Sequence, residues 1–131
     1  MADANTITEF LNCTHYAVVG VSADHGKYGY IIWRDLQKKG YTVFPINPRY
    51  DEIEGETCYR SLADVPGTID VVDLVVPPRV TEDVVRQCAD LGLTRVWMQP
   101  GAESEKALDF CRRNGITVLH DVCVIAESRR P

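Results

Sequence analysis

The segment from residue 20 to residue 29 combines small residues with a lysine in a pattern that can bind phosphate. It reads Gly-Val-Ser-Ala-Asp-His-Gly-Lys-Tyr-Gly and stands between an apolar run and a helical pattern. Backbone N–H groups approach a phosphate closely at small residues, and the start of a helix favours an anion. Glycines also serve the close packing of a helix on a strand without any ligand. We expect a phosphate site that includes Gly20, Val21, Ser22, Lys27, Tyr28 and Gly29.

A second polar turn, Asn47-Pro48-Arg49, follows the second apolar run and narrows the choice of ligand. The dinucleotide pattern G-x-G-x-x-G is absent, because Gly20 is followed by valine and serine. An NAD site also usually places an acidic residue after this strand for the ribose hydroxyls, and asparagine stands here instead. The asparagine can bond a ribose, and Arg49 can bind an extra sugar phosphate. These features disfavour NAD and allow coenzyme A (CoA) or NADP.

Two prolines, Pro77 and Pro78, follow the third apolar run next to Val76. They remove two backbone donors and form a rigid apolar lip that suits stacking against an adenine ring. A stiff turn between a strand and a helix explains the same prolines without a ligand. Gln99 and Gly101 lie in the corresponding turn after the fourth apolar run, so we include them in the candidate site.

The five cysteines contain no CxxC pair and no histidine at zinc-like spacing. This pattern disfavours a disulfide framework and a structural metal site, and it suits reduced thiols in a cytoplasmic protein. Cys123 differs from the others because it follows the last apolar run, close to His120. There it could form a mixed disulfide with CoA or act as a redox sensor, but the pattern favours a buried thiol that anchors the tail.

Short apolar runs alternate with helical patterns along the chain, which predicts a parallel sheet covered by helices. Strands are expected over 16–21, 41–46, 71–76, 95–99 and 116–119, and longer helices over 30–39, 81–91 and 103–114. Right-handed crossovers then give an α/β fold, a doubly wound Rossmann-like sheet with strand order 3-2-1-4-5 and helices on both faces. We expect one domain over residues 1–131.

Ligands of such sheets bind at the carboxyl ends of the strands. This rule selects five loops, which span residues 20–29, 47–50, 76–79, 99–101 and 120–123.

Composition excludes several function classes. The 131 residues include 14 Lys and Arg against 19 Asp and Glu, a net charge of −5, so nonspecific nucleic-acid binding through a basic surface is not expected. The longest apolar stretches are too short to cross a membrane, and the first residues do not resemble a secretory signal. No GxSxG, HExxH or Walker A pattern is present. We therefore predict no catalytic residues.

Several motifs occur in the order found in small CoA-binding domain proteins, and this resemblance covers nearly the whole chain. They are Gly20-Val-Ser22, Gly29-Tyr30, Gly40-Tyr41-x-Val-Phe-Pro45-Ile-Asn47-Pro48, Ile53-x-Gly55, Tyr59-x-Ser61-Leu62, Ile69-Asp70-x-Val-Asp73-Leu-Val-Val-Pro77-Pro78, Trp97-Met-Gln99-Pro-Gly101, and Asp121-x-Cys123 with Glu127 and Arg129. The chain is also similar to the N-terminal, CoA-binding domain of the succinyl-CoA synthetase α subunit.

The resemblance implies a cleft that holds CoA. It places residues 20–22 and Lys27 near the phosphates, Asn47-Pro48-Arg49 near the ribose phosphate, and residues 76–78 near adenine. The phosphorylated histidine of the synthetase belongs to a later domain, so the resemblance gives His120 no catalytic role.

We expect a cytoplasmic protein that binds CoA or an acyl-CoA, forms a homodimer, and has no complete active site of its own. Three alternatives stay open at this point. They are an NADP-binding reductase, an accessory subunit of an acyl-CoA synthetase, and a redox-responsive regulator that senses a nucleotide.

Overall fold

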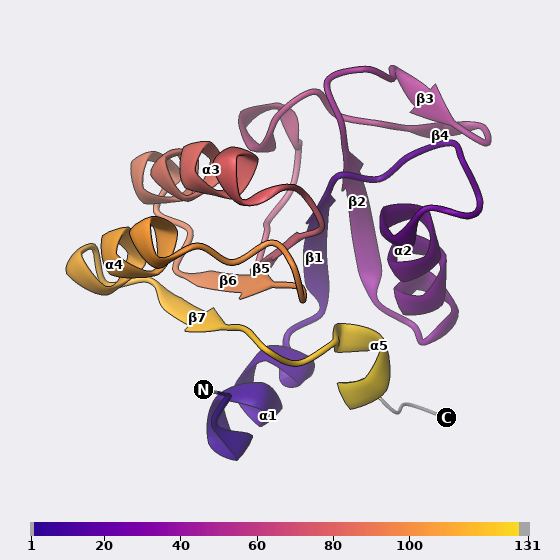
Figure 1. The fold of residues 1–131 in the computed structure, drawn as a ribbon. Helices are drawn as coiled ribbons and strands as arrows, with labels where there is room; N and C mark the ends of the chain where they lie inside the picture. The colour runs from indigo at the N-terminus through magenta and orange to yellow at the C-terminus, as the bar shows by residue number, and fades with distance from the viewer. Residues whose placement is uncertain (1, 129–131) are drawn as a thin grey trace.

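A computed structural model describes residues 2–128, in which helices pack on both sides of a central sheet (Figure 1). Arg129, which the resemblance includes, lies outside the described residues. The helices are α1 (Ala4–Asn12), α2 (Tyr28–Lys38), the 3₁₀ turn η1 (Leu62–Asp64), α3 (Pro78–Leu91), α4 (Glu105–Arg113) and α5 (Val124–Glu127). The strands are β1 (His15–Val19), β2 (Thr42–Ile46), β3 (Glu52–Ile53), β4 (Glu56–Thr57), β5 (Val71–Leu74), β6 (Arg95–Met98) and β7 (Thr117–Leu119).

The main sheet has the order β2-β1-β5-β6-β7, and all of its neighbouring strands are parallel. The expected α/β class, with a five-stranded parallel sheet between helices, is confirmed. The expected strand order is wrong. Numbered along the chain, the five strands lie in the order 2-1-3-4-5, because the third (β5) pairs with β1 and not with β2.

Two observations explain this order. Every residue of β5 is buried, which suits a strand with a neighbour on each side better than a strand at an edge. The outer edge of β2, where the third strand was expected, is paired instead with Tyr59, which bridges Ile46 and accepts a hydrogen bond from the Asn47 N–H at 2.9 Å. The chain then crosses β1 through η1 before β5 begins.

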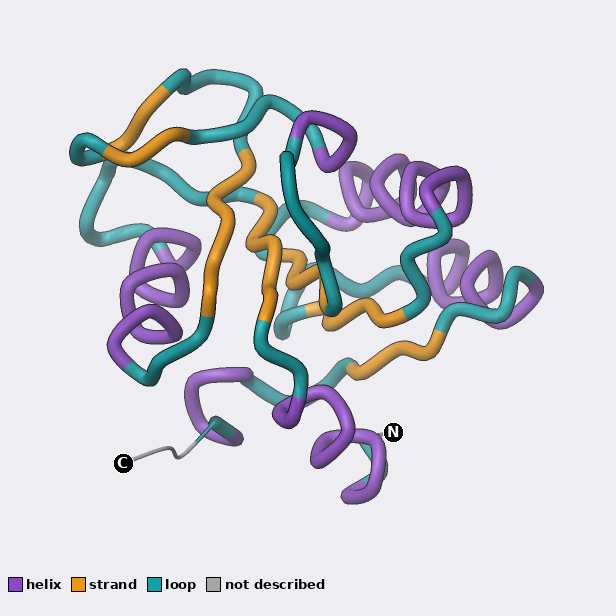
Figure 2. Tube along the Cα trace, turned by 180° about the vertical axis from the view of Figure 1, so that it is seen from behind, coloured by secondary structure: helices purple, strands orange, loops and turns teal. Residues whose placement is uncertain are grey.

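Alternate residues of β1 face opposite layers, as the strand period requires. Tyr16 and Val18 pack into the cluster that holds buried side chains of α1, α2 and α5. Ala17 and Val19 pack into the cluster that holds those of η1, α3 and α4. The reverse view shows the same division of the helices between two faces (Figure 2). The doubly wound arrangement therefore follows from alternation in the strands.

The observed helices begin at residues that differ from the expected ones. α3 starts at Pro78, three residues before the expected start at Thr81, because the fixed φ of proline suits the first position of a helix. α2 starts at Tyr28 and not at Tyr30. Both helices therefore begin directly at the carboxyl edge of the sheet.

A small hairpin, β3–β4, packs on the outer side of α2 through ion pairs. The Arg34 guanidinium places one nitrogen 2.6 Å from a Glu54 carboxylate oxygen and the other 2.6 Å from a Glu56 carboxylate oxygen. His25 of the β1–α2 loop also pairs with Glu54. The hydrogen bonds from Arg34 and Tyr30 lower the pKa of Glu54 to about 2. The hairpin thereby joins the loop that precedes α2 to the helix itself.

Candidate ligand-binding site

The five predicted loops meet at one edge of the molecule. Because the five strands of the main sheet are parallel, their carboxyl ends all face the same way (Figure 1). The loops that follow β1, β2, β5, β6 and β7 are those that the sequence selected. The structure thus brings the predicted segments together, and the individual side chains decide what each segment offers.

Gly20 and Gly29 allow a close approach of three backbone segments. Gly20 has φ +103°, and a Cβ there would lie 2.3 Å from the carbonyl oxygen of Val75. A Cβ on Gly29 would lie 2.1 Å from the carbonyl oxygen of Gly20. The turn after β1 is therefore enclosed between the turn after β5 and the first turn of α2. Close packing explains both glycines, and it also places the first turn of α2 at the edge of the sheet.

The loop between β1 and α2 is ordered by its own hydrogen bonds. The Ser22 hydroxyl accepts from the Asp24 N–H at 3.0 Å, and an Asp24 carboxylate oxygen accepts from the Gly26 N–H at 2.9 Å. Ser22 also bonds the phenol of Tyr50 and lowers its pKa. Lys27 precedes the first residue of α2, its exposed side chain does not cap the helix, and Val21 is buried. Lys27 therefore supplies the positive charge of this loop.

Asn47 joins the turn after β2 to the turn after β1. Its side-chain Nδ2 donates to the Val21 carbonyl at 2.8 Å, and its Oδ1 accepts from the Arg49 N–H at 2.9 Å. Both ends of the amide are thus engaged within the protein. Arg49 itself is exposed, and Pro48 faces the neighbouring cavity. Of this turn, Pro48 and Arg49 are the side chains that are placed to meet a ligand.

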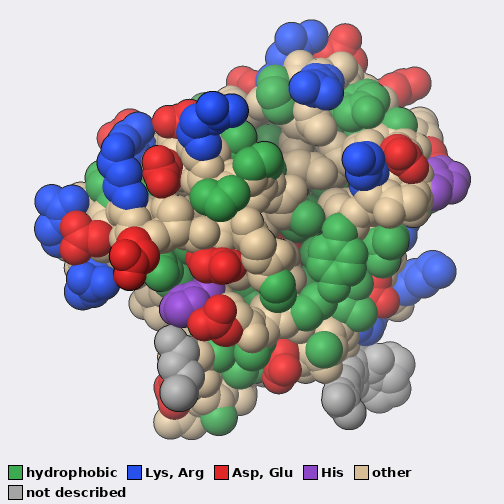
Figure 3. All heavy atoms as spheres, in the orientation of Figure 1, with side chains coloured by type: hydrophobic (Ala, Val, Ile, Leu, Met, Phe, Trp, Pro, Cys, Tyr) green, Lys and Arg blue, Asp and Glu red, His purple; other side chains and the backbone are tan. Residues whose placement is uncertain are grey.

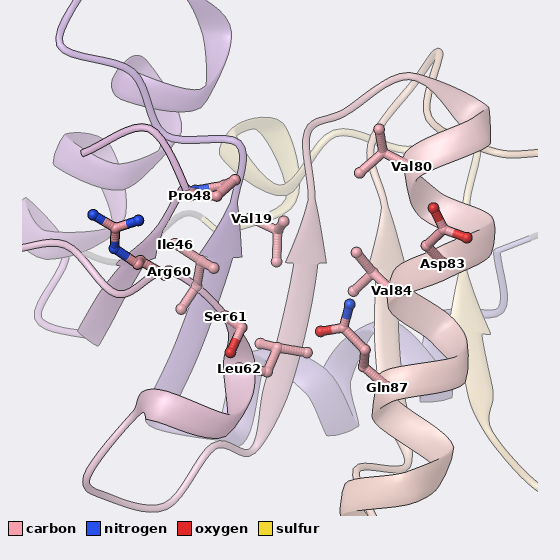
Figure 4. Close-up of a pocket in the computed structure, with 10 residues that line it drawn as sticks. All are labelled: Val19, Ile46, Pro48, Arg60, Ser61, Leu62, Val80, Asp83, Val84 and Gln87. Atoms are coloured by element: carbon pink, nitrogen blue, oxygen red, sulfur yellow. The ribbon is translucent and has the colours of Figure 1, made fainter. Parts of the chain in front are cut away.

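A cavity of about 200 Å³ opens beside this turn, between the ends of β1 and β2, η1 and α3 (Figure 4). Its walls are largely aliphatic, and four polar or charged side chains line it as well. The lining residues are Val19, Ile46, Pro48, Arg60, Ser61, Leu62, Val80, Asp83, Val84 and Gln87. Sequence reasoning placed only Pro48 of these in the site, although Ser61-Leu62 belongs to a quoted motif.

A second, shallower hollow lies between the turns after β5 and β6. It is lined by Tyr28, Val75, Val76, Pro77, Pro100, Gly101 and Ala102. Four of these were predicted site residues, namely Tyr28, Val76, Pro77 and Gly101. Pro78 is exposed as the first residue of α3 and does not line the hollow. Of the predicted apolar lip, Pro77 lines this hollow and Pro78 does not.

Gln99 lies below the edge and not on it. Its side chain is 1% exposed, its Nε2 donates to Asp73 Oδ1 at 2.6 Å, and its Oε1 accepts from the Val124 N–H at 3.1 Å. Burial raises the pKa of Asp73 to about 7, and the hydrogen bond from Gln99 opposes that rise. In this arrangement the amide of Gln99 links the sheet to α5 and does not face the surface.

Cys123 is half-buried, and its Sγ lies 2.6 Å from the hydroxyl oxygen of Tyr28. Burial raises the pKa of Cys88 to about 12 and that of Cys111 to about 11, so these thiols are inert. The predicted thiol thus lies beside a side chain that lines the second hollow.

Within residues 2–128, no group of three or more His, Cys, Asp and Glu side chains is arranged to hold a metal ion. Among the helices of the described chain, none is long and apolar enough to span a bilayer.

A family model described as a CoA binding domain matches residues 14–129. The chain belongs to the CoA binding domain family. The resemblance found from the motifs is therefore confirmed. An ADP-forming acetate–CoA ligase from Methanocaldococcus jannaschii is 42% identical to this CoA binding domain over 116 residues, which are 82% of this chain and 16% of the ligase.

Solved structures share the fold and part of the sequence. A conserved hypothetical protein from Pyrococcus furiosus is 43% identical, with a TM-score of 0.85, over 88% of this CoA binding domain and 99% of that chain. A dinucleotide-forming acetyl-CoA synthetase from Ca. Korarchaeum cryptofilum is 30% identical, with a TM-score of 0.72, over 86% of this domain and 26% of the synthetase. The chain thus spans roughly a quarter or less of the ligase and of the synthetase that it matches.

Proposed function

We propose that this protein binds CoA or an acyl-CoA across the carboxyl edge of its sheet. The observation that supports the proposal is the order in which three surfaces lie along that edge. An aliphatic cavity with a polar rim lies beside Pro48, the cations Lys27 and Arg49 flank the turns after β1 and β2, and an apolar hollow lies beyond Val76 and Pro77. These surfaces match, in order, a base, phosphates and a pantetheine arm.

The cavity in Figure 4 suits adenine, and we assign the base to it. Val19, Ile46 and Pro48 offer apolar contact to the faces of a ring. The Asp83 carboxylate can accept from the exocyclic amine, and the Gln87 amide can bond the ring nitrogens. The prediction that residues 76–78 hold adenine is thereby changed, and Val76 and Pro77 are assigned to the arm.

Phosphates are proposed to lie over the start of α2. The N-terminal end of this helix favours negative charge, and Lys27 adds an ammonium group. Arg49 stands on the next turn and is assigned to the phosphate on the ribose, which CoA carries at its 3′ position. Arg60, which lines the cavity and pairs with Asp51 at 3.0 Å, extends this positive rim. A protein of net charge −5 thus gathers cations beside the turn after β2.

We propose that the described residues form a binding site without a complete active site. His25 and His120 are engaged with neighbouring acids, Glu54 and Asp121. Relatives named as acetate–CoA ligases carry a region like this one within longer chains, which supports a second candidate, an accessory role in an acyl-CoA synthetase. Family membership favours CoA over NADP as the ligand. The cytoplasmic location, the homodimer and the single domain expected from the sequence stay predictions.

Calorimetric titration with CoA, dephospho-CoA and NADP tests the proposal. We expect CoA to bind, and at 100 times its Kd to raise the free energy of unfolding by about 2.7 kcal/mol. Arg49→Ala should weaken CoA binding by roughly 10- to 100-fold and leave dephospho-CoA binding unchanged, because one charge-assisted contact contributes about 1.5–3 kcal/mol. Arg112→Ala on α4 removes another exposed arginine, away from the edge, and serves as the control. Stabilisation by NADP but not by CoA would refute the assignment.

A further inference from the structure

Cys123 stands next to the hollow to which the proposed function assigns the pantetheine arm. Its Sγ lies 2.6 Å from the Tyr28 hydroxyl, and Tyr28, which is 45% exposed, forms part of the wall of that hollow. Tyr28 and Ile31 of α2 are exposed. Hydrophobic side chains gather on the molecule in the region of α2 in the space-filling view (Figure 3). The reactive end of a CoA molecule bound in the proposed direction would therefore arrive within one side chain of this thiol.

The backbone on both sides of Cys123 is fixed by side chains of the central sheet. Trp97 Nε1 donates to the Val122 carbonyl at 2.9 Å, and Gln99 Oε1 accepts from the Val124 N–H at 3.1 Å. Val122 is thus hydrogen-bonded to Trp97 of β6, and Val124 to Gln99 in the turn directly after β6. The thiol is held toward Tyr28 by the core of the protein.

An unpaired carboxyl oxygen gives a second indication of a ligand at this place. Asp73 is fully buried, its Oδ1 accepts from Gln99, and its Oδ2 has no hydrogen-bond partner among residues 2–128. Gln99, which donates to this carboxyl, also accepts from the N–H of Val124, the residue that follows Cys123, so the unpaired oxygen lies within the same hydrogen-bonded group as the thiol segment. Buried polar atoms usually have partners. A pantetheine arm carries two amide N–H groups, which are donors of the kind that this oxygen lacks.

The other described thiols do not share this position. Cys58, Cys88 and Cys111 are buried. Cys13 is half-buried like Cys123, but it ends α1 and precedes β1, at the amino edge of the sheet. Cys13 is therefore a comparison thiol of similar exposure that is remote from the proposed ligand, and burial raises its pKa.

We propose that Cys123 exchanges with a disulfide of CoA bound at this edge and becomes a mixed disulfide with CoA. The inference rests on the proposed function. In the step, the Cys123 thiol loses its proton to solvent and its sulfur attacks the sulfur of the bound CoA. A bond forms between these two sulfurs while the original S–S bond breaks, and the leaving thiolate takes up a proton. The cysteine sulfur is oxidised and the leaving sulfur is reduced.

The test uses the full chain, CoA disulfide as the probe, and peptide mass mapping of the adduct. We expect Cys123 to be modified at least roughly tenfold faster than Cys13, because binding holds the disulfide next to the sulfur. Excess adenosine 3′,5′-bisphosphate, which has the nucleotide part of CoA and no thiol, should slow this modification by competition. It should not slow modification by glutathione disulfide, which has no nucleotide. Dithiothreitol should remove the adduct.

Three variants complete the design. Cys123→Ser should abolish the rapid phase, whereas Cys13→Ser should retain it. Tyr28→Phe should slow it several-fold, because the hydroxyl beside the sulfur can donate to the attacking thiolate. Calorimetry with reduced CoA is run on each variant in parallel. If CoA binds but Cys123 reacts no faster than Cys13, or the bisphosphate does not compete, the inference is overturned and the binding function stands. If CoA does not bind, both fail.

Discussion

Replacing Gly29 by alanine tests the close approach on which the whole edge depends. Gly29 is the second residue of α2, where alanine would normally be preferred by about 0.5–1 kcal/mol because glycine loses more backbone entropy on folding. A Cβ at this position would lie 2.1 Å from the Gly20 carbonyl oxygen, about 1.3 Å short of the 3.4 Å at which ordinary contact begins. The obstacle is backbone, so a change of rotamer cannot relieve it.

The two effects have opposite signs, and the steric one is expected to be larger. Overpacking of this kind costs about 1–3 kcal/mol. After the gain in helix propensity is subtracted, we expect Gly29→Ala to lower the free energy of unfolding by about 1–2 kcal/mol. The first turn of α2 must also move away from the turn after β1, which should weaken CoA binding by roughly tenfold, or about 1.4 kcal/mol.

Urea unfolding and calorimetric titration with CoA measure both effects. Gly40→Ala is the matched control, because Gly40 has φ +96° and an added Cβ would meet nothing within 4 Å. That variant should lose about 1–2 kcal/mol through backbone strain alone and bind CoA as the unmodified protein does. If Gly29→Ala instead unfolds at a higher urea concentration with an unchanged m value, helix propensity dominates and the close approach is refuted.

Two further changes probe the side chains beneath the edge. Asn47→Ala should lower the free energy of unfolding by about 1–2 kcal/mol in urea titrations, because the Val21 carbonyl loses its donor; no change would mean that water replaces the amide. Asp73→Asn should remove a pH dependence. Between its ordinary pKa of about 3.9 and its folded value of about 7, the folded state keeps a proton that the unfolded chain releases, so stability falls by up to about 1.4 kcal/mol per pH unit as pH rises. The difference in free energy of unfolding between the unmodified protein and Asp73→Asn should therefore change between pH 4 and 7 and be constant above pH 7. A difference that is constant over the whole range would refute the role of the buried carboxyl.

The fold class was predictable from local patterns, but the strand order was not. Apolar runs bounded by glycine, proline and polar residues indicate buried parallel strands wherever they occur. The neighbour of a strand depends on contacts far apart in sequence, and the segment 47–70 has no helix of ordinary length to indicate its path. Pairing of Tyr59 with the outer edge of β2 is such a contact, and nothing in the periodicity of residues 58–60 signals it.

The error in strand order also hid most of the cavity. Arg60, Ser61 and Leu62 reach it because the chain crosses β1 after Tyr59, and Asp83 and Gln87 reach it because β5 places α3 next to β1. A third strand beside β2 would have separated these segments. In contrast, Pro48, Val76 and Pro77 follow strand ends directly, so the rule for carboxyl ends was sufficient to find them.

The glycines and the buried polar pair show why residue type alone does not assign a role. The sequence favoured phosphate binding for Gly20 and Gly29 over tight packing alone, and only the short distances between their backbones identify the packing. Gln99 lies in the correct turn, yet its amide is directed to Asp73 and to the start of α5. Burying a carboxyl and an amide costs free energy of desolvation, so such a pair is expected where its hydrogen bonds hold a segment in place. Here the position that they fix is that of Val124, the residue after Cys123, which makes the core polar pair and the proposed thiol exchange parts of one arrangement.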